Sequence, residues 1–246
     1  MRWLLFSFVG IAAGGCTDSE EAARVELPVN TAAAAFAPAT TDLGYVVSVE
    51  EMQAAVSTIQ FTIEGEMHQD VTTPPGTIAH PGHYAGGEVT GELPGDFILN
   101  WNGQPHDPLG MGTLIVGDYK GANFSFRTAI ATDNVPTLTG HAIHLAGTIA
   151  KDATTKPFDL LIDVEVDTAI VGAVFEDVIA KTSTETLAIT FYPTDPYEND
   201  TPFDDVDFFS LPTTAAGAIE IRPGSETHNI IRRVLTTHDH YGVSAI

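Results

Sequence analysis

The chain has 246 residues, of which 43% are hydrophobic, and it carries 10 lysines and arginines against 33 aspartates and glutamates, a net charge of -23. A surface of that sign repels nucleic-acid phosphates, so nucleic acid is not an expected partner. A lone cysteine excludes an internal disulfide, and stability must come from the core of one sizeable domain.

The N-terminus has the parts of an export signal. A cationic start at Arg2 precedes an apolar stretch from Leu4 to Ala13 and two glycines. That stretch is shorter than the about 20 apolar residues that span a bilayer, so residues 1–15 are predicted to be a signal peptide. The following Cys16 gives the segment a resemblance to a bacterial lipoprotein signal, which implies cleavage and acylation at this cysteine. The lipoprotein interpretation places the protein in the bacterial cell envelope, lipid-anchored at the outer membrane or the periplasmic face. An ordinary secretory signal is the alternative, and in either case the mature chain is expected to be exported.

Residues 16–42 are predicted to be the lipidated cysteine and a flexible tether. The segment is rich in alanine, weakly patterned and interrupted by Pro38, as a spacer behind a lipid anchor would be. An N-terminal strand around Arg24 to Val29 is the alternative. Residues 43–246 are predicted to form a single domain, held at the membrane by the lipid alone.

From Tyr45 onward, apolar residues alternate with polar ones. The clearest alternating sets are Ile59, Phe61 and Ile63; Phe124 and Phe126; Phe158, Leu160, Ile162, Val164 and Val166; and Leu187, Ile189 and Phe191. Alternation places one face of a strand in a core and the other in water, as in antiparallel sheets. Turn-rich connections such as residues 151–156 separate the strands. The predicted fold is therefore all-β, an antiparallel β-sandwich, with a partly open barrel as the alternative.

One amphipathic helix is predicted over about residues 225–237. Ser225 is a suitable N-cap, and Glu226 is favourable near the positive end of the helix dipole. The apolar residues that recur at helical spacing are Ile230, Ile231, Val234 and Leu235. We expect this helix to cover an open edge or end of the sandwich.

Several motifs resemble those of exported bacterial lipoproteins of unknown function that contain a prealbumin-like β-sandwich domain. The motifs are Gly112-Thr113-Leu114 through Phe124-Ser125-Phe126, Gly140-His141 through Gly147-Thr148, Lys156-Pro157-Phe158-Asp159, and Thr201-Pro202-Phe203-Asp204 through Phe208. A more distant similarity is to the methanobactin-associated periplasmic copper-binding proteins. The resemblance would cover about residues 45–237 and implies a fold and a location more than a reaction.

Nine histidines are the most unusual chemical feature. His80 and His83 flank Pro81-Gly82, a pair typical of a type II turn, which holds its end Cα atoms within about 7 Å. Two imidazoles held at this separation can bind one metal ion together. His68 enters the same loop as a third candidate ligand. Glu88 and Glu92 follow it as candidate oxygen ligands or supporting contacts. A surface turn that happens to be flanked by histidines is the alternative.

Two further histidine pairs are candidate ligands. His238 and His240 are two residues apart, so on an extended chain they point to the same side and can chelate together. His141 and His144 are three apart, so on a strand they face opposite ways and at most one would join a shared site. The other would be a polar residue on the wet side or a core histidine.

Signals for other functions are weak. The acidic run from Asp195 to Asp207 lacks the spacing of an EF-hand calcium loop and is predicted to be a solvated loop. Nucleophile-elbow, phosphate-loop and zinc-protease motifs are absent from the sequence. The sequence therefore favours a lipid-anchored, non-catalytic protein that binds zinc or copper through histidines. The alternatives are a metal-free module that recognises a glycan or protein partner, with Trp101 or Tyr84 on its surface, and a metal-dependent hydrolase or oxidase.

Overall fold

The computed structural model describes residues 22–63, 66–67, 84–85 and 88–246. The predicted signal peptide, Cys16, His68, His80 and His83 lie outside this part of the chain. Within it, no helix is long and apolar enough to cross a membrane.

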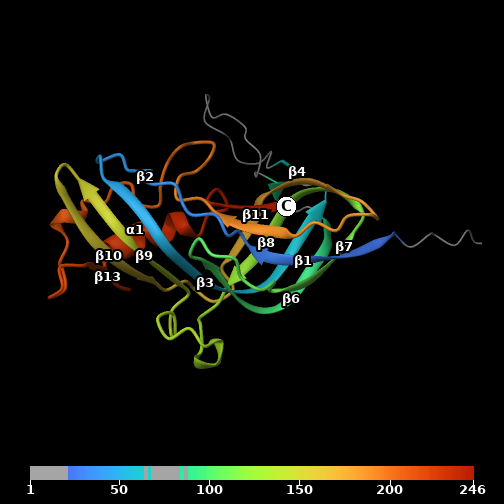
Figure 1. Ribbon diagram of the computed structural model, residues 1–246, viewed down its shortest axis with the longest axis horizontal. Helices are drawn as coiled ribbons and strands as arrows, with labels where there is room; N and C mark the ends of the chain where they lie inside the picture. The colour runs from blue at the N-terminus through green and yellow to red at the C-terminus, as the bar shows by residue number, and fades with distance from the viewer. Residues whose placement is uncertain (1–21, 64–65, 68–83, 86–87) are drawn as a thin grey trace, which may run out of the picture.

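The described chain is all-β with one α-helix near its C-terminal end, as predicted (Figure 1). The strands are β1 (Arg24–Thr31), β2 (Ala39–Thr40), β3 (Val46–Ile63), β4 (Glu66–Met67), β5 (Tyr84–Ala85), β6 (Glu88–Trp101), β7 (Gly110–Ile115), β8 (Gly117–Phe126), β9 (Ile143–Lys151), β10 (Thr154–Ile162), β11 (Ala169–Ile179), β12 (Leu187–Phe191), β13 (Ile219–Ile221) and β14 (Tyr241–Ala245). The helix is α1 (Glu226–Leu235), and two short 3-10 turns cover Ala131–Asp133 and Phe208–Ser210.

Eight strands of the main sheet pair in a closed ring. The order around it is β3-β6-β7-β1-β12-β14-β11-β8, and β8 pairs again with β3. Most pairs are antiparallel, but β1 runs parallel to β12 and β11 parallel to β14. The two sides of the ring face each other across one core, as the two layers of a sandwich do.

The long strand β3 joins this ring to a second group of strands. Its C-terminal half pairs with β6 and β8, whereas its N-terminal half pairs with β9 and β2. β10 and β13 extend the sheet beyond β9, and α1 packs beside β10. In Figure 1 this second group, with α1, lies at the opposite end of the molecule from β6 and β7.

The predicted alternation matches the core closely. The inward side chains of β3, β8, β10 and β12 are buried in one apolar cluster, with Phe61, Phe126, Leu160 and Phe191 at most 1% exposed. The pattern over β10 ends sooner than predicted, because the strand stops at Ile162 and Val166 is 65% exposed in the following turn.

The predicted tether is wrong for residues 24–31, which form β1 between β7 and β12. Here the alternative of an N-terminal strand is correct. Leu27 and Val29 are fully buried, and the strand supplies one wall of the ring. Burial of these apolar side chains stabilises the folded state, whereas a solvated spacer would leave them in water. The following residues also pack on the body, since the Phe36 ring makes an edge-to-face contact with Phe191.

The predicted helix is confirmed, as is its N-cap. The Ser225 side chain accepts a hydrogen bond from the backbone N–H of His228 at 3.1 Å. Ile231 and Leu235 are fully buried on the inner face. The helix therefore closes one end of the sheet, as its amphipathic pattern indicates.

Candidate functional site

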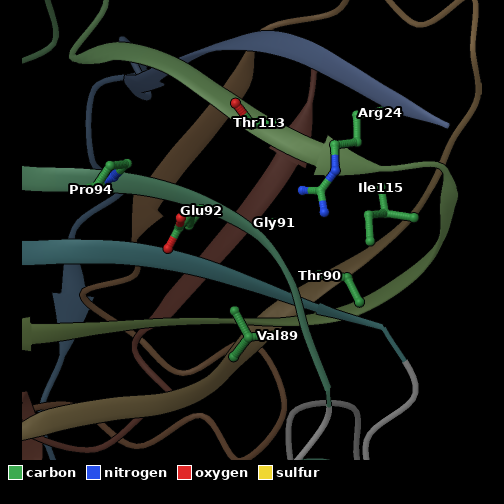
Figure 2. A pocket seen from close by; sticks show the side chains of 8 residues that line it. All are labelled: Arg24, Val89, Thr90, Gly91, Glu92, Pro94, Thr113 and Ile115. Carbon is green, nitrogen blue, oxygen red and sulfur yellow. The ribbon is translucent and has the colours of Figure 1, made fainter. Parts of the chain in front are cut away.

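A pocket of about 390 Å³ lies on the outer face of β6, β7 and β1. Figure 2 shows the side chains that line it, which are Arg24, Val89, Thr90, Gly91, Glu92, Pro94, Thr113 and Ile115. Its volume is within the range of about 300–1,000 Å³ usual for small-molecule sites. It combines one cation, one anion and two hydroxyl groups with aliphatic walls.

The register of the three strands sets the positions of the polar groups. Glu92 pairs with Thr113 across β6 and β7, and Ile115 pairs with Arg24 across β7 and β1. Because side chains alternate along a strand, these four point outward while residues between them, such as Leu114, point into the core. A rigid sheet therefore holds the polar groups of the pocket.

A β-bulge places Thr90 in the pocket. Phe61 of β3 pairs with Gly91 and the next residue, Thr62, pairs with Val89, so Thr90 is an extra residue on β6. Bulges re-aim a side chain and are common beside functional sites. Thr90 is 6% exposed, and its Oγ1 has no hydrogen-bond partner within the described structure. A buried hydroxyl without a partner costs free energy.

The two charged groups of the pocket do not neutralise each other. In the described residues, Arg24 forms no ion pair with Glu92, nor with Glu26, two residues along on the same face. Figure 2 shows the guanidinium of Arg24 reaching toward β6 near Gly91, and the Glu92 carboxylate farther along β6. The pocket thus offers opposite charges across a gap.

The arginines elsewhere in the sheet behave differently. Arg127 forms a two-pronged ion pair with Asp133, at 2.8 and 2.9 Å. Arg222 binds Asp159 at 2.6 Å and Glu220 at 2.7 Å. Arg24, which lines the pocket, has no such partner among the described residues.

Tyr119 forms part of the support beneath the pocket. It is fully buried, its hydroxyl donates to the backbone oxygen of Ile115 at 2.8 Å, and the backbone oxygen of Thr90 lies 3.4 Å from the same hydroxyl. Burial raises the pKa of Tyr119, so the hydroxyl stays protonated and remains a donor at neutral pH. It therefore ties together the strand ends that carry Thr90 and Ile115.

The structure places two of the predicted histidine ligands beside separate carboxylates. His141 Nδ1 lies 2.6 Å from Asp163 Oδ1, and His144 Nε2 lies 3.4 Å from Asp159 Oδ2. Burial acts to raise the pKa of Asp159, but hydrogen bonds from Arg222 and His144 outweigh it and lower that pKa. His144 is 4% exposed, so it is the core histidine of the pair.

The C-terminal histidine pair also splits between different partners. His238 Nε2 lies 3.1 Å from Asp239 Oδ1. His240 is 1% exposed and its Nδ1 donates to the backbone oxygen of Tyr192 at 2.8 Å. Its Nε2 is buried and has no hydrogen-bond partner within the described chain.

The described residues contain no group of three or more histidine, cysteine, aspartate or glutamate side chains arranged to hold a metal ion. His68, His80 and His83 lie outside them, as does the side chain of Glu88, so a metal centre there stays a prediction. Glu92 lies in the outer-face pocket, where it shares the lining with Arg24.

Two other predicted features have structural roles. Trp101 is 1% exposed and its indole N–H donates to the backbone oxygen of Ile189, so it is a core residue and does not sit on an open recognition surface. The acidic loop is held by hydrogen bonds within it and to its neighbours, as when Asp204 accepts from the backbone N–H groups of Thr201 and Asp42. The side chain of Tyr84 lies outside the described residues.

Sequence reasoning missed Arg24, Thr90 and Thr113. Assigning residue 24 to a tether removed its guanidinium from consideration. The signal that could have found it is the alternation of Val25, Leu27 and Val29 with polar residues or proline directly after Arg24. The bulge at Thr90 depends on the register between β3 and β6, which cannot be predicted from a local sequence pattern.

Comparison of the chain with protein-family models, with curated proteins and with solved structures finds no match. The candidate site therefore depends on geometry and chemistry alone.

Proposed function

We propose that this protein is an exported cell-envelope protein, anchored by a lipid on Cys16, that binds a small zwitterionic ligand in the pocket of Arg24 and Glu92. The ligand class is an amino acid or short peptide with free ends. This develops the recognition-module alternative of the sequence analysis. The observation that carries the proposal is the pair of opposite charges that line one pocket without forming an ion pair.

The pocket chemistry suits such a ligand. A guanidinium binds a carboxylate with two parallel hydrogen bonds, and a carboxylate binds an ammonium group. The hydroxyl group of Thr113 is available for the peptide group between the ends. Val89, Pro94 and Ile115 supply apolar surface for side chains. Among the described residues that line this pocket, none has an aromatic ring of the kind on which sugars stack.

The spacing also suits a ligand of one to three residues. Arg24 on β1 and Glu92 on β6 lie on either side of β7, and their partners on β7 are two residues apart. With about 4.8 Å between strands and about 3.4 Å per residue, their Cα atoms are roughly 12 Å apart. The arginine and glutamate side chains take up part of that distance.

Calorimetric titration of the purified domain with a library of dipeptides and tripeptides tests the proposal. We expect saturable binding of free-ended peptides and losses of about tenfold or more when the amine is acetylated or the carboxylate amidated. A Lys181→Gln variant, which removes an exposed charge outside the pocket, should bind as the wild type does. If no free-ended peptide binds, or if blocking both ends has no effect, the proposal fails.

Binding of zinc or copper is the second candidate, and His240 favours it. A metal-binding histidine usually donates its other ring N–H to a carbonyl or carboxylate, as His240 Nδ1 does to Tyr192. The remaining Nε2 then carries a free lone pair. Elemental analysis and zinc titration of the wild type, a His80→Ala/His83→Ala variant and a His240→Ala variant test this. If the wild type holds no metal and takes up none, this candidate is excluded.

A further inference from the structure

A second pocket lies between the outer face of α1 and the turn after β10. Its volume is about 350 Å³, and it is lined by Val164, Glu165, Thr168, Asn229, Arg232, Arg233 and Thr236. Asn229, Arg232 and Arg233 of α1 and its C-cap residue Thr236 are spaced i, i+3, i+4 and i+7, so they lie on one side of the helix. The opposite face of α1 holds the buried Ile231 and Leu235.

The two arginines of this pocket have no acidic partner. Among the described residues, neither Arg232 nor Arg233 forms an ion pair or side-chain hydrogen bond, although Glu165 lines the same pocket. Two adjacent guanidiniums repel each other unless an anion lies between or beside them. Among the residues that line the pocket, the two arginines and Glu165 sum to a charge of +1, in a chain of net charge -23.

The hydrogen bonds around Asn229 add a further donor. His228 Nε2 accepts from the backbone N–H of Asp163 at 3.1 Å, so its proton is on Nδ1. That Nδ1 lies 3.1 Å from Asn229 Oδ1 and therefore donates to it. The amide NH₂ of Asn229 is not used in this contact, and Asn229 lines the pocket together with the two arginines.

We propose that this second pocket binds the phosphate or sulfate group of a small soluble molecule. Guanidinium groups match the oxygens of such groups, and the Asn229 amide and the Thr168 hydroxyl extend the set of donors. The pocket is several times larger than the roughly 30 Å³ that one water molecule occupies, so there is space for an organic part beyond the anion. The site is separate from the pocket of Arg24 and does not depend on its function.

A purely structural role for the arginines makes a different prediction. Cations in the last turn of a helix interact favourably with its dipole, and such a role needs no ligand. Replacing the arginines would then lower the melting temperature equally with and without added anion. Ligand binding instead predicts a loss of the anion-dependent rise in melting temperature.

The test compares melting temperatures and calorimetric titrations with inorganic phosphate, with sulfate, and with chloride at matched ionic strength. At 0.15 M ionic strength the Debye length is about 8 Å, so repulsion between the negatively charged protein and the anion is screened beyond that distance. For the wild type we expect saturable phosphate or sulfate binding that chloride does not reproduce. The Arg232→Gln/Arg233→Gln variant should bind at least about tenfold more weakly. Since both side chains lie on the outer helix face, this variant should fold.

Matched controls make the outcome decisive. Arg233→Gln should weaken binding, whereas Lys181→Gln, which removes the same charge elsewhere, should not. The proposal is overturned if chloride matches phosphate and sulfate, or if the double variant binds phosphate as the wild type does. It is also overturned if only vesicles of anionic lipid bind, because the anion would then be a membrane headgroup.

Discussion

At the residue scale, pairing separates the arginines into two kinds. Arg127 and Arg222 are neutralised by carboxylates, whereas Arg24, Arg232 and Arg233 line pockets without acidic partners in the described chain. Arg127 is 11% exposed, so removing its partner Asp133 would leave a poorly solvated charge. An unpaired arginine on a pocket wall contributes little to folding and is available to a ligand.

Arg127 and Asp133 provide a test of the structural kind. Their side chains are 11% and 14% exposed, and the pair anchors the segment between β8 and β9. Asp133→Asn should cost about 1.5–3 kcal/mol of unfolding free energy at pH 7, because a charge-assisted pair is lost. Urea unfolding of the wild type and variant measures the difference, and a value near zero would contradict the assigned role.

The same pair predicts a pH dependence. Hydrogen bonding from Arg127 lowers the pKa of Asp133 in the folded protein. The ion pair therefore contributes its full stabilisation at a pH above the ordinary aspartate pKa. It is lost as pH falls through the lowered pKa. The stability gap between the wild type and Asp133→Asn should therefore narrow on acidification, in unfolding curves taken from pH 6 downward. A gap that widens would contradict this sign.

At the element scale, β1 shows what local patterns miss. Its eight residues follow the alternation of a strand, yet the alanine-rich stretch behind them favours a tether. What fixes β1 is its pairing with β7 and β12, which are far away along the chain. By contrast, α1 depends on local signals, namely its cap and helical spacing, and was predictable from sequence.

Leu27→Ala tests whether β1 is part of the core. Leu27 is fully buried, so the substitution should cost about 2–5 kcal/mol of unfolding free energy. Glu26→Ala, on the exposed face of the same strand, is the control and should change stability by about 0.5 kcal/mol or less. Equal effects of both changes, measured by denaturant unfolding, would indicate that residues 24–31 do not fold into the sheet.

The cap of α1 makes a smaller prediction. Ser225→Ala removes the hydrogen bond to the His228 N–H and should cost about 1 kcal/mol. Ser225→Asp keeps an acceptor at the N-cap and should retain most of the stability. If the two variants unfold at the same denaturant concentration, the side chain of Ser225 does not cap the helix.

At the scale of the whole molecule, alternation and turns were sufficient to predict an all-β fold with one C-terminal helix. The sequence left a sandwich and a partly open barrel as alternatives, because closure of the strands into a ring depends on non-local pairings such as β3 with β8. The same limit applies to the site: Glu92 was named from sequence as an oxygen ligand, but its pocket combines β6 and β7 with β1, which is adjacent in the ring yet far away along the chain. Only the folded sheet brings Arg24 to the same face.

The central claim is that Arg24 binds the carboxylate of a zwitterionic ligand, and a two-by-two affinity cycle tests it most directly. Affinities are measured for wild type and Arg24→Gln, each with the tightest-binding free-ended peptide and its C-terminal amide. We predict that amidation weakens binding to the wild type about tenfold or more, yet has no further effect on Arg24→Gln. Equal losses on amidation in both proteins would show that the carboxylate binds elsewhere.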